Sequence, residues 1–119
     1  RYFVIMPYNI ETIPLMRLFI ATDRQLRLRL STDIITLYEL NAGQRVVLGY
    51  DRDADAIALR QADNAADPTA ATVDKRGYIS ARPFYHRTRI PAEARRYTFA
   101  AVHDGWLVFK AEPVLKADD

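Results

Sequence analysis

The stretch RRYTFAAVHDGWLVFKA, residues 95–111, decides the fold class of this 119-residue chain. Two runs rich in aromatic and β-branched residues flank the dipeptide Asp104-Gly105, which follows His103. Asp-Gly between two such runs is typical of a tight β-hairpin, because glycine adopts positive φ at little steric cost. The sequence therefore predicts a two-stranded hairpin here. The residues that we expect this hairpin to bury are Tyr97, Phe99, Val108 and, in part, Trp106.

A second hairpin is predicted upstream of the first. Residues 45–50 (RVVLGY) and 56–60 (AIALR) have strand-like patterns and flank the polar segment Asp51–Asp55. We expect a bulge at Gly49, since a glycine inside a strand often marks one. Further upstream, leucine alternates with arginine in residues 26–30, and this period of two predicts a half-buried strand.

Two other segments require a choice between strand and helix. Residues 34–38 (IITLY) are rich in β-forming residues and are predicted to be a strand. Residues 82–90 (RPFYHRTRI) are predicted to be a short helix, because proline is tolerated in the first turn of a helix and Pro91 ends the segment. The chain is therefore expected to be mainly β.

Composition divides the chain into five segments. They are an N-terminal apolar arm (1–25), a first β unit (26–62), a polar linker (63–71), a second β unit (72–112) and a polar tail (113–119). The two β units each read as strand, connector or helix, strand, hairpin and strand. A unit of this size cannot bury its apolar face alone, so we expect the two units to pair within one chain.

An internal alignment supports this tandem pseudo-repeat. The aligned segments are Ser31–Thr36 with Lys75–Ser80, Arg45–Leu48 with Arg96–Phe99, and Ala56–Arg60 with Trp106–Lys110. In this alignment the second unit carries seven extra residues, which we assign to its helix.

The N-terminal arm is apolar from Tyr2 to Ile20 but is interrupted by prolines and charged residues. It is therefore predicted to be neither a membrane span nor a signal peptide, and we expect a cytoplasmic protein without membrane contact. We expect one or two short strands between Met6 and Ile20 that pack on the core. The alternative is an arm that contacts a partner or another copy of the chain.

Short motifs in both units match a known family. The first motif is a basic residue, a glycine, an isoleucine and a small hydroxyl residue in series, as in Lys75-Arg76-Gly77-Tyr78-Ile79-Ser80. The second motif, Asn41–Val46, leads into the predicted hairpin of residues 45–60. Ile57–Arg60 and Leu107–Lys110 each close a unit. On these residues the chain resembles the AbrB-type swapped-hairpin family, with Asp33 in place of the glycine of the first unit. The resemblance implies a small swapped-hairpin-like β-barrel that binds DNA. In this chain an N-terminal arm precedes the barrel.

Motifs for catalysis and for cofactors are not found in the sequence. The chain has no cysteine and only two histidines, His86 and His103, in different elements. The segment Asp51–Asp55 starts like a calcium loop, but Ala56 and Ala62 occupy the positions that need glycine and glutamate. There is no glycine-flanked nucleophile and no phosphate-binding glycine loop. We therefore expect a non-enzymatic protein without cofactor or metal.

Charge is distributed unevenly along the chain. Seven basic residues lie between Lys75 and Tyr97 against the single acid Glu93, a net charge of +6. Residues 49–68 carry −3. A basic segment with interleaved aromatic residues favours contacts with nucleic acid, since arginine forks onto phosphates and stacks on bases. The predicted nucleic-acid contacts are Arg27, Arg29, Lys75, Arg76, Tyr78, Arg82, Tyr85, Arg87 and Arg89. The alternatives are a solvated face whose arginines brace the acidic hairpin, or a protein interface.

These observations leave three functional hypotheses. The first is a DNA-binding protein that acts as a transcriptional regulator of prokaryotic or phage type. The second is a single-stranded nucleic-acid-binding protein whose aromatic residues stack on bases. The third is a small virion-type assembly protein that forms homo-oligomers through its arm and strand edges.

Overall fold

Eight strands and two short helices make up the part of the chain that the computed structural model describes, residues 7–113. In chain order they are β1 (Phe19–Thr22), β2 (Arg27–Leu30), α1 (Thr32–Tyr38), β3 (Arg45–Asp51), β4 (Ala56–Gln61), β5 (Ala70–Thr72), β6 (Tyr78–Ser80), α2 (Arg82–Thr88), β7 (Arg95–His103) and β8 (Trp106–Ala111). The expectation of a mainly β chain is confirmed. No helix within residues 7–113 is long and apolar enough to cross a membrane.

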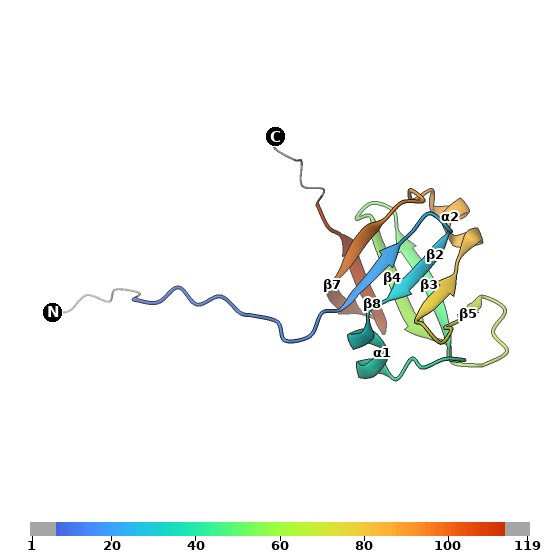
Figure 1. Cartoon of the computed structure of the whole chain (residues 1–119), viewed down its shortest axis with the longest axis horizontal. Coiled ribbons are helices and arrows are strands. Elements are labelled where there is room, and N and C mark those ends of the chain that lie inside the picture. The colour runs from blue at the N-terminus through green and yellow to red at the C-terminus, as the bar shows by residue number, and fades with distance from the viewer. Residues whose placement is uncertain (1–6, 114–119) are drawn as a thin grey trace.

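The strands form one antiparallel sheet that curls into a nearly closed barrel (Figure 1). Their order is β5-β3-β4-β8-β7-β1-β2-β6, and the end strands β5 and β6 face each other across a seam. Each half of the chain supplies two strands, a helix and two more strands. Four ladders join the halves: β1–β7 and its counterpart β3–β5, and the ladders β2–β6 and β4–β8. The two halves therefore close the barrel within one chain, but each starts earlier than the predicted unit, because β1 lies in the predicted arm and β5 begins in the predicted linker.

The ladders correct one part of the internal alignment. The counterpart of the turn at residues 74–77 is the turn at residues 23–26, and not the segment Ser31–Thr36. In both turns an aspartate Oδ1 accepts two backbone N–H groups: Asp23 those of Gln25 and Arg27, and Asp74 those of Arg76 and Tyr78. Leu26, with φ of 59°, takes the place of Gly77, with φ of 82°. A leucine in this left-handed conformation concealed the repeat. The ladders agree with the other two aligned pairs of segments.

The strand predicted at residues 34–38 is wrong, because this segment lies in α1. Ser31 caps the helix by accepting a hydrogen bond from the backbone N–H of Ile34, and Asp33 places a negative charge in the first turn. Ile34 is fully buried and anchors the helix to the core. Capping and burial thus override the β propensity of the segment, and both units contain a seven-residue helix. The predicted helix in the second unit is confirmed.

The β7–β8 hairpin is confirmed, but its buried face differs from the expectation. Tyr97 is buried, as expected, and Phe99 is half-buried. In β8 the buried residues are Leu107 and Phe109, because their β4 partners Leu59 and Ile57 point into the core. Since side chains alternate along a strand, Trp106 and Val108 lie on the outer side, where both are half-buried; this agrees with the expectation for Trp106 and differs from that for Val108.

Gly49 is not a bulge. It pairs regularly with Ala58, and the Trp106 ring lies over it, 3.2 Å from where a Cβ would stand. The bulge occurs in β7, between Phe99 and Ala101.

The N-terminal arm packs on the core as expected only at its end, where Leu18 contacts the core and Ile20 is buried in β1. Residues 7–18 contain no strand, and the chain enters the barrel only at β1. Tyr8, Ile10, Ile13 and Leu15 are 65–93% exposed, and the arm runs away from the barrel (Figure 1). Residues 1–6 and all but the first residue of the predicted polar tail lie outside the described part.

Gly77 and Gly105 form a matched pair for testing the repeated turn. Both have φ of +82°, so alanine is strained at each, at a cost of about 1 kcal/mol. A Cβ at Gly77 would also lie 2.6 Å from Cδ1 of Ile35, whereas a Cβ at Gly105 meets nothing within 4 Å. We expect Gly77→Ala to lower the free energy of unfolding by about 2–3 kcal/mol and Gly105→Ala by about 1 kcal/mol, measured by urea denaturation. Equal losses would show that this turn does not press on α1.

Candidate nucleic-acid interface

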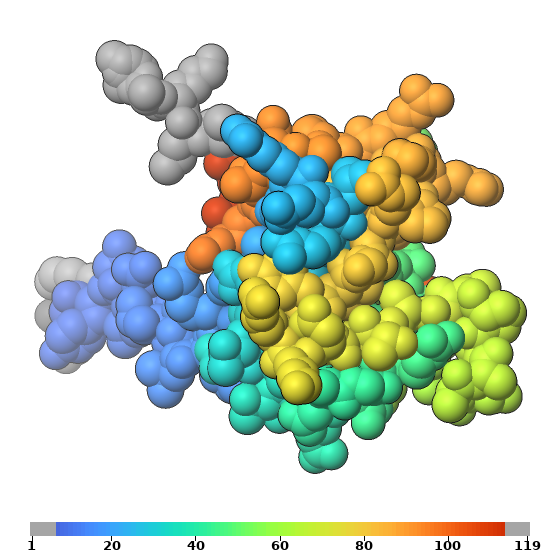
Figure 2. Space-filling model, turned by 45° about the vertical axis from the view of Figure 1, so that its right-hand side comes forward, coloured from blue at the N-terminus to red at the C-terminus, as the bar shows by residue number. Residues whose placement is uncertain are grey.

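The β2–β6 ladder places basic and aromatic side chains on one outer surface of the barrel. Leu28 pairs with Ile79, and both point inward and are fully buried. Their strand neighbours Arg27, Arg29 and Tyr78 therefore point outward. Figure 2 shows this side of the molecule, with the light-blue segment of β2 beside the yellow segment of β6.

A row of aligned residues extends this surface over four strands. Arg96 of β7 pairs with Ala21 of β1, Ala21 pairs with Arg29, and Arg29 pairs with Tyr78. Because Ala21 is small, a hollow of about 350 Å³ opens in the row, lined in part by Arg29, Tyr78 and Arg96. The hollow thus has a guanidinium group on each side.

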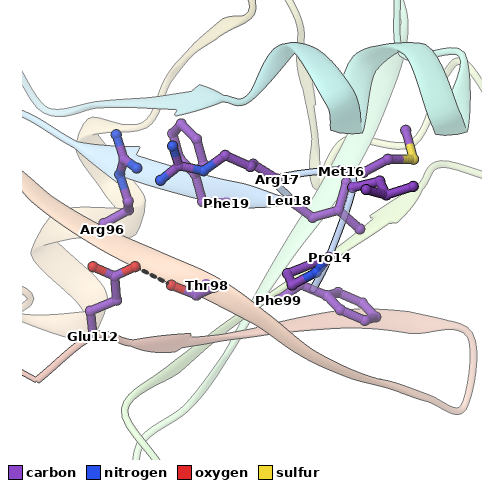
Figure 3. Close-up of a pocket in the computed structure, with 10 residues that line it drawn as sticks. Pro14, Met16, Arg17, Leu18, Phe19, Arg96, Thr98, Phe99 and Glu112 are labelled. Atoms are coloured by element: carbon purple, nitrogen blue, oxygen red, sulfur yellow. Dashed lines mark hydrogen bonds between the residues drawn. The ribbon is translucent and has the colours of Figure 1, made fainter. Parts of the chain in front are cut away.

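The aromatic rings of this surface are covered by arginine. The guanidinium carbon of Arg27 lies 4.2 Å from the centre of the Tyr78 ring, and that of Arg96 lies 3.9 Å from the centre of the Phe19 ring. Arg29 approaches the same Phe19 ring at 5.4 Å. Figure 3 shows Arg96 and Phe19 at the edge of an adjoining hollow. Stacking on these rings fixes the guanidinium groups in place. The guanidinium group of Arg27 also donates hydrogen bonds to Asp23 and Gln25.

The two repeated turns add cations at both ends of the β2–β6 ladder. Lys75 and Arg76 are exposed at one end, and Arg24 is exposed at the other, where the backbone N–H of Ala81 bonds to the turn and Arg82 begins α2. The backbone N–H groups of Tyr78 and Arg76 lower the pKa of the Asp74 carboxyl, which stays ionised to hold its turn.

We call the resulting surface the basic face. Its members are Arg24, Arg27, Arg29, Lys75, Arg76, Arg82 and Arg96. Among the described residues, only Arg27 of this set has a carboxylate within 4.0 Å, namely Asp23 at 2.8 Å. The other six cations of the basic face thus form no ion pair with the carboxylates of residues 7–113.

The prediction that Tyr85 contacts nucleic acid is wrong. The side chain is 3% exposed, and its hydroxyl donates to the backbone oxygen of Arg27 and accepts from the backbone N–H of Asp23 at 3.1 Å. Burial raises the pKa of the Tyr85 phenol to about 12. Tyr85 therefore supports the turn below the basic face.

Arg87 and Arg89 lie apart from the basic face, at the far end of α2. There Arg52 of the β3–β4 hairpin donates to the backbone oxygens of Arg87 and Thr88, both at 3.0 Å. Neither Arg87 nor Arg89 has a carboxylate of the described residues within 4.0 Å.

The expected bracing of the acidic hairpin by arginines of the second unit occurs at another residue. Asp55 is 3.3 Å from Arg95, at the start of β7, and it accepts a hydrogen bond from the Tyr50 hydroxyl at 2.7 Å. This pairing leaves Arg87 and Arg89 exposed and available as control positions.

Three members of the site were missed in the sequence: Arg24, Arg96 and Phe19. All three depend on β1, which pairs with β2 and β7. The sequence pattern places Phe19 in an arm packed on the core and so does not predict this pairing. Within residues 7–113, no three side chains of histidine, aspartate or glutamate form a group that could hold a metal ion. The chain matches no family model, no curated protein and no solved structure.

Removal of the Tyr85 hydroxyl gives a pH-dependent test of its buried role. We expect Tyr85→Phe to lower the free energy of unfolding at neutral pH by about 1–2 kcal/mol, because the N–H of Asp23 loses its partner. The phenol is neutral in both states below pH 10, its pKa when unfolded. Between pH 10 and 12 it ionises only in the unfolded state, so wild type loses about 1.4 kcal/mol of stability per pH unit through this group.

The measurement is a series of urea denaturation curves at rising pH. Tyr85→Phe should lack this part of the alkaline loss. An identical pH profile for wild type and variant would show that the phenol is exposed to water.

Proposed function

We propose that this protein binds double-stranded DNA through the basic face and has no enzymatic activity. The observation that carries the proposal is the Arg96–Ala21–Arg29–Tyr78 row, in which two guanidinium groups flank a hollow and have no carboxylate of residues 7–113 within 4.0 Å. Cations fixed on one surface neutralise phosphates and release the counterions of DNA, and this release drives binding. The neighbouring Lys75 and Arg76 extend the same contact.

The state of the aromatic rings favours duplex over single-stranded DNA. Bases of a single strand stack on free aromatic faces. Here guanidinium groups cover the Tyr78 and Phe19 rings, so neither covered ring face is free for a base. The Phe19 ring supports Arg96, which can reach a phosphate. Phosphate contacts position a protein on a duplex without stacking.

The resemblance to AbrB-type proteins supports the same proposal. The run Lys75–Ser80, which carries the resemblance, forms the turn and strand at the basic face. We infer that the protein is a regulator of the prokaryotic or phage type that this resemblance implies, and that it acts in the cytoplasm.

A comparison of two double variants tests the interface. Affinity for a labelled duplex is measured by fluorescence anisotropy over a series of salt concentrations, and the logarithm of affinity should fall linearly with the logarithm of salt. Arg29→Ala with Arg96→Ala removes two phosphate contacts, so we expect the slope to flatten by about 1.8. The control, Arg87→Ala with Arg89→Ala, removes the same charge from the far end of α2 and should leave the slope unchanged.

Three outcomes would contradict the proposal. Equal flattening by both variants would place the contact along α2 or make it non-specific. Tighter binding to single strands than to duplex would favour the single-stranded hypothesis. No affinity for either DNA at low salt would favour the assembly protein.

A further inference from the structure

The arm and one end of the barrel expose complementary apolar surfaces. Within residues 7–113, the large hydrophobic side chains that are exposed number seven, and five of them lie in the arm, at Tyr8, Ile10, Ile13, Leu15 and Met16. The other two, Leu37 and Val102, lie on the barrel. Such side chains clustered on a surface mark an interaction site.

Leu37 and Val102 belong to the same end of the barrel. Val102 lines a hollow of about 320 Å³ together with Tyr38, the neighbour of Leu37 at the end of α1. The hollow continues inward to Leu40, Leu59 and Leu107 of the core. Arg60 and Gln61 also line the hollow, and its other side chains are apolar or aromatic. We call this hollow the α1 cleft.

The pseudo-repeat relates the α1 cleft to a position beside α2, and that position is covered by the β3–β4 hairpin. At the matching end of α2, Tyr50 of the β3–β4 hairpin packs edge-on against Phe84 with ring centres 6.3 Å apart, and Arg52 bonds to the last turn of the helix. Val102 is the counterpart of Tyr50. Tyr50 pairs with Ile57 in the β3–β4 ladder, and Val102 pairs with Leu107, the counterpart of Ile57, in the β7–β8 ladder.

The β7–β8 hairpin is too short to cover the α1 cleft. Only Asp104 and Gly105 connect β7 to β8, whereas Arg52 is one of four residues that connect β3 to β4. The β7–β8 hairpin thus has the smaller Val102 in place of Tyr50, and it has no counterpart of Arg52. The α1 cleft therefore lacks its intramolecular cover.

We propose that the α1 cleft binds the N-terminal arm of a second copy of this chain. The arm supplies isoleucine and leucine side chains for an apolar cleft and is already extended and unpaired. Residues 7–16 reach about 35 Å when extended, enough to bridge two adjacent barrels. A reciprocal exchange about a two-fold axis fills both clefts and leaves no arm free.

The arm of the same chain points away from its own cleft. The backbone N–H of Arg17 donates to Asp33 at the start of α1, at 2.7 Å, and the backbone N–H of Phe99 donates to the oxygen of Leu18 at 2.9 Å. In Figure 3, Pro14 lies next to Phe99, so the root of the arm is held against β7. From this root the arm leaves the barrel (Figure 1), whereas the cleft lies at the other end of α1.

Complementation between two defective variants tests this exchange. Ile10→Asp with Ile13→Asp disables the arm, and Val102→Asp disables the cleft; both sets of positions are exposed, so the fold should persist in a thermal melt. In sedimentation velocity experiments we expect the wild-type chain to form dimers and each variant to associate about a hundredfold more weakly. A mixture of the two variants should form heterodimers, because one intact arm then meets one intact cleft.

Controls carry the same charges at positions that supply no large apolar side chain to the proposed contact. Asn9→Asp with Thr12→Asp adds two charges to the arm without removing an apolar side chain, and Ala100→Asp adds one to the exposed part of β7. Both should dimerise like wild type. A monomeric wild-type chain at the highest attainable concentration would overturn the proposal. Dimers of Val102→Asp would exclude the cleft, and failure of the mixture to associate would indicate contact between arms.

Discussion

The structure depends on the pairing of two half-barrels that are too small to bury their own apolar faces. Four ladders join the halves, and two of them have fully buried pairs at their centre: Leu28 beside Ile79 in β2–β6, and Ile57 beside Phe109 in β4–β8. Without these contacts, each half would expose one side of a short sheet to water. Register is therefore fixed by burial, since a slip of one residue would turn leucine outward and arginine inward.

The same constraint forms the basic face. Because side chains alternate along a strand, burial of Leu28 and Leu30 forces Arg27 and Arg29 to the surface. Arg96 reaches the same row because Tyr97 is buried next to it. The proposed binding surface is thus the outer side of the ladder that holds the halves together, and its arginines are positioned by the core.

Local patterns in the sequence were sufficient to predict the two hairpins and the start of α2, whose contacts lie between residues close in sequence. Asp104-Gly105 and the polar segment at residues 51–55 indicate their hairpins directly, and Pro83 indicates the start of α2. Elements that depend on distant contacts were not predictable in this way. The burial of Tyr85, for example, follows from a backbone oxygen and an N–H group 58 and 62 residues away.

The candidate site was predictable to a similar degree. Six of its cations or aromatic residues follow from the charge pattern: Arg27, Arg29, Lys75, Arg76, Tyr78 and Arg82. Arg96 and Phe19 become part of the site only through the pairing of β1 with β7, a contact between residues nearly 80 positions apart. No local pattern contains that information, because the residues that fix it belong to different units.

Fusion of the two units in one chain lets their surfaces diverge. In a dimer of identical units, every cation on one side of the two-fold axis recurs on the other. Here the counterpart of Arg96 is Arg45, whose guanidinium group donates to Thr72 and to the backbone oxygen of Asp67 in the linker. The counterpart of Phe19 is Ala70, which offers no ring on which an arginine could stack. The frame of the barrel is therefore two-fold, whereas the basic face lies on one side of it, because only one of the two related surfaces keeps its arginine free and its aromatic ring in place.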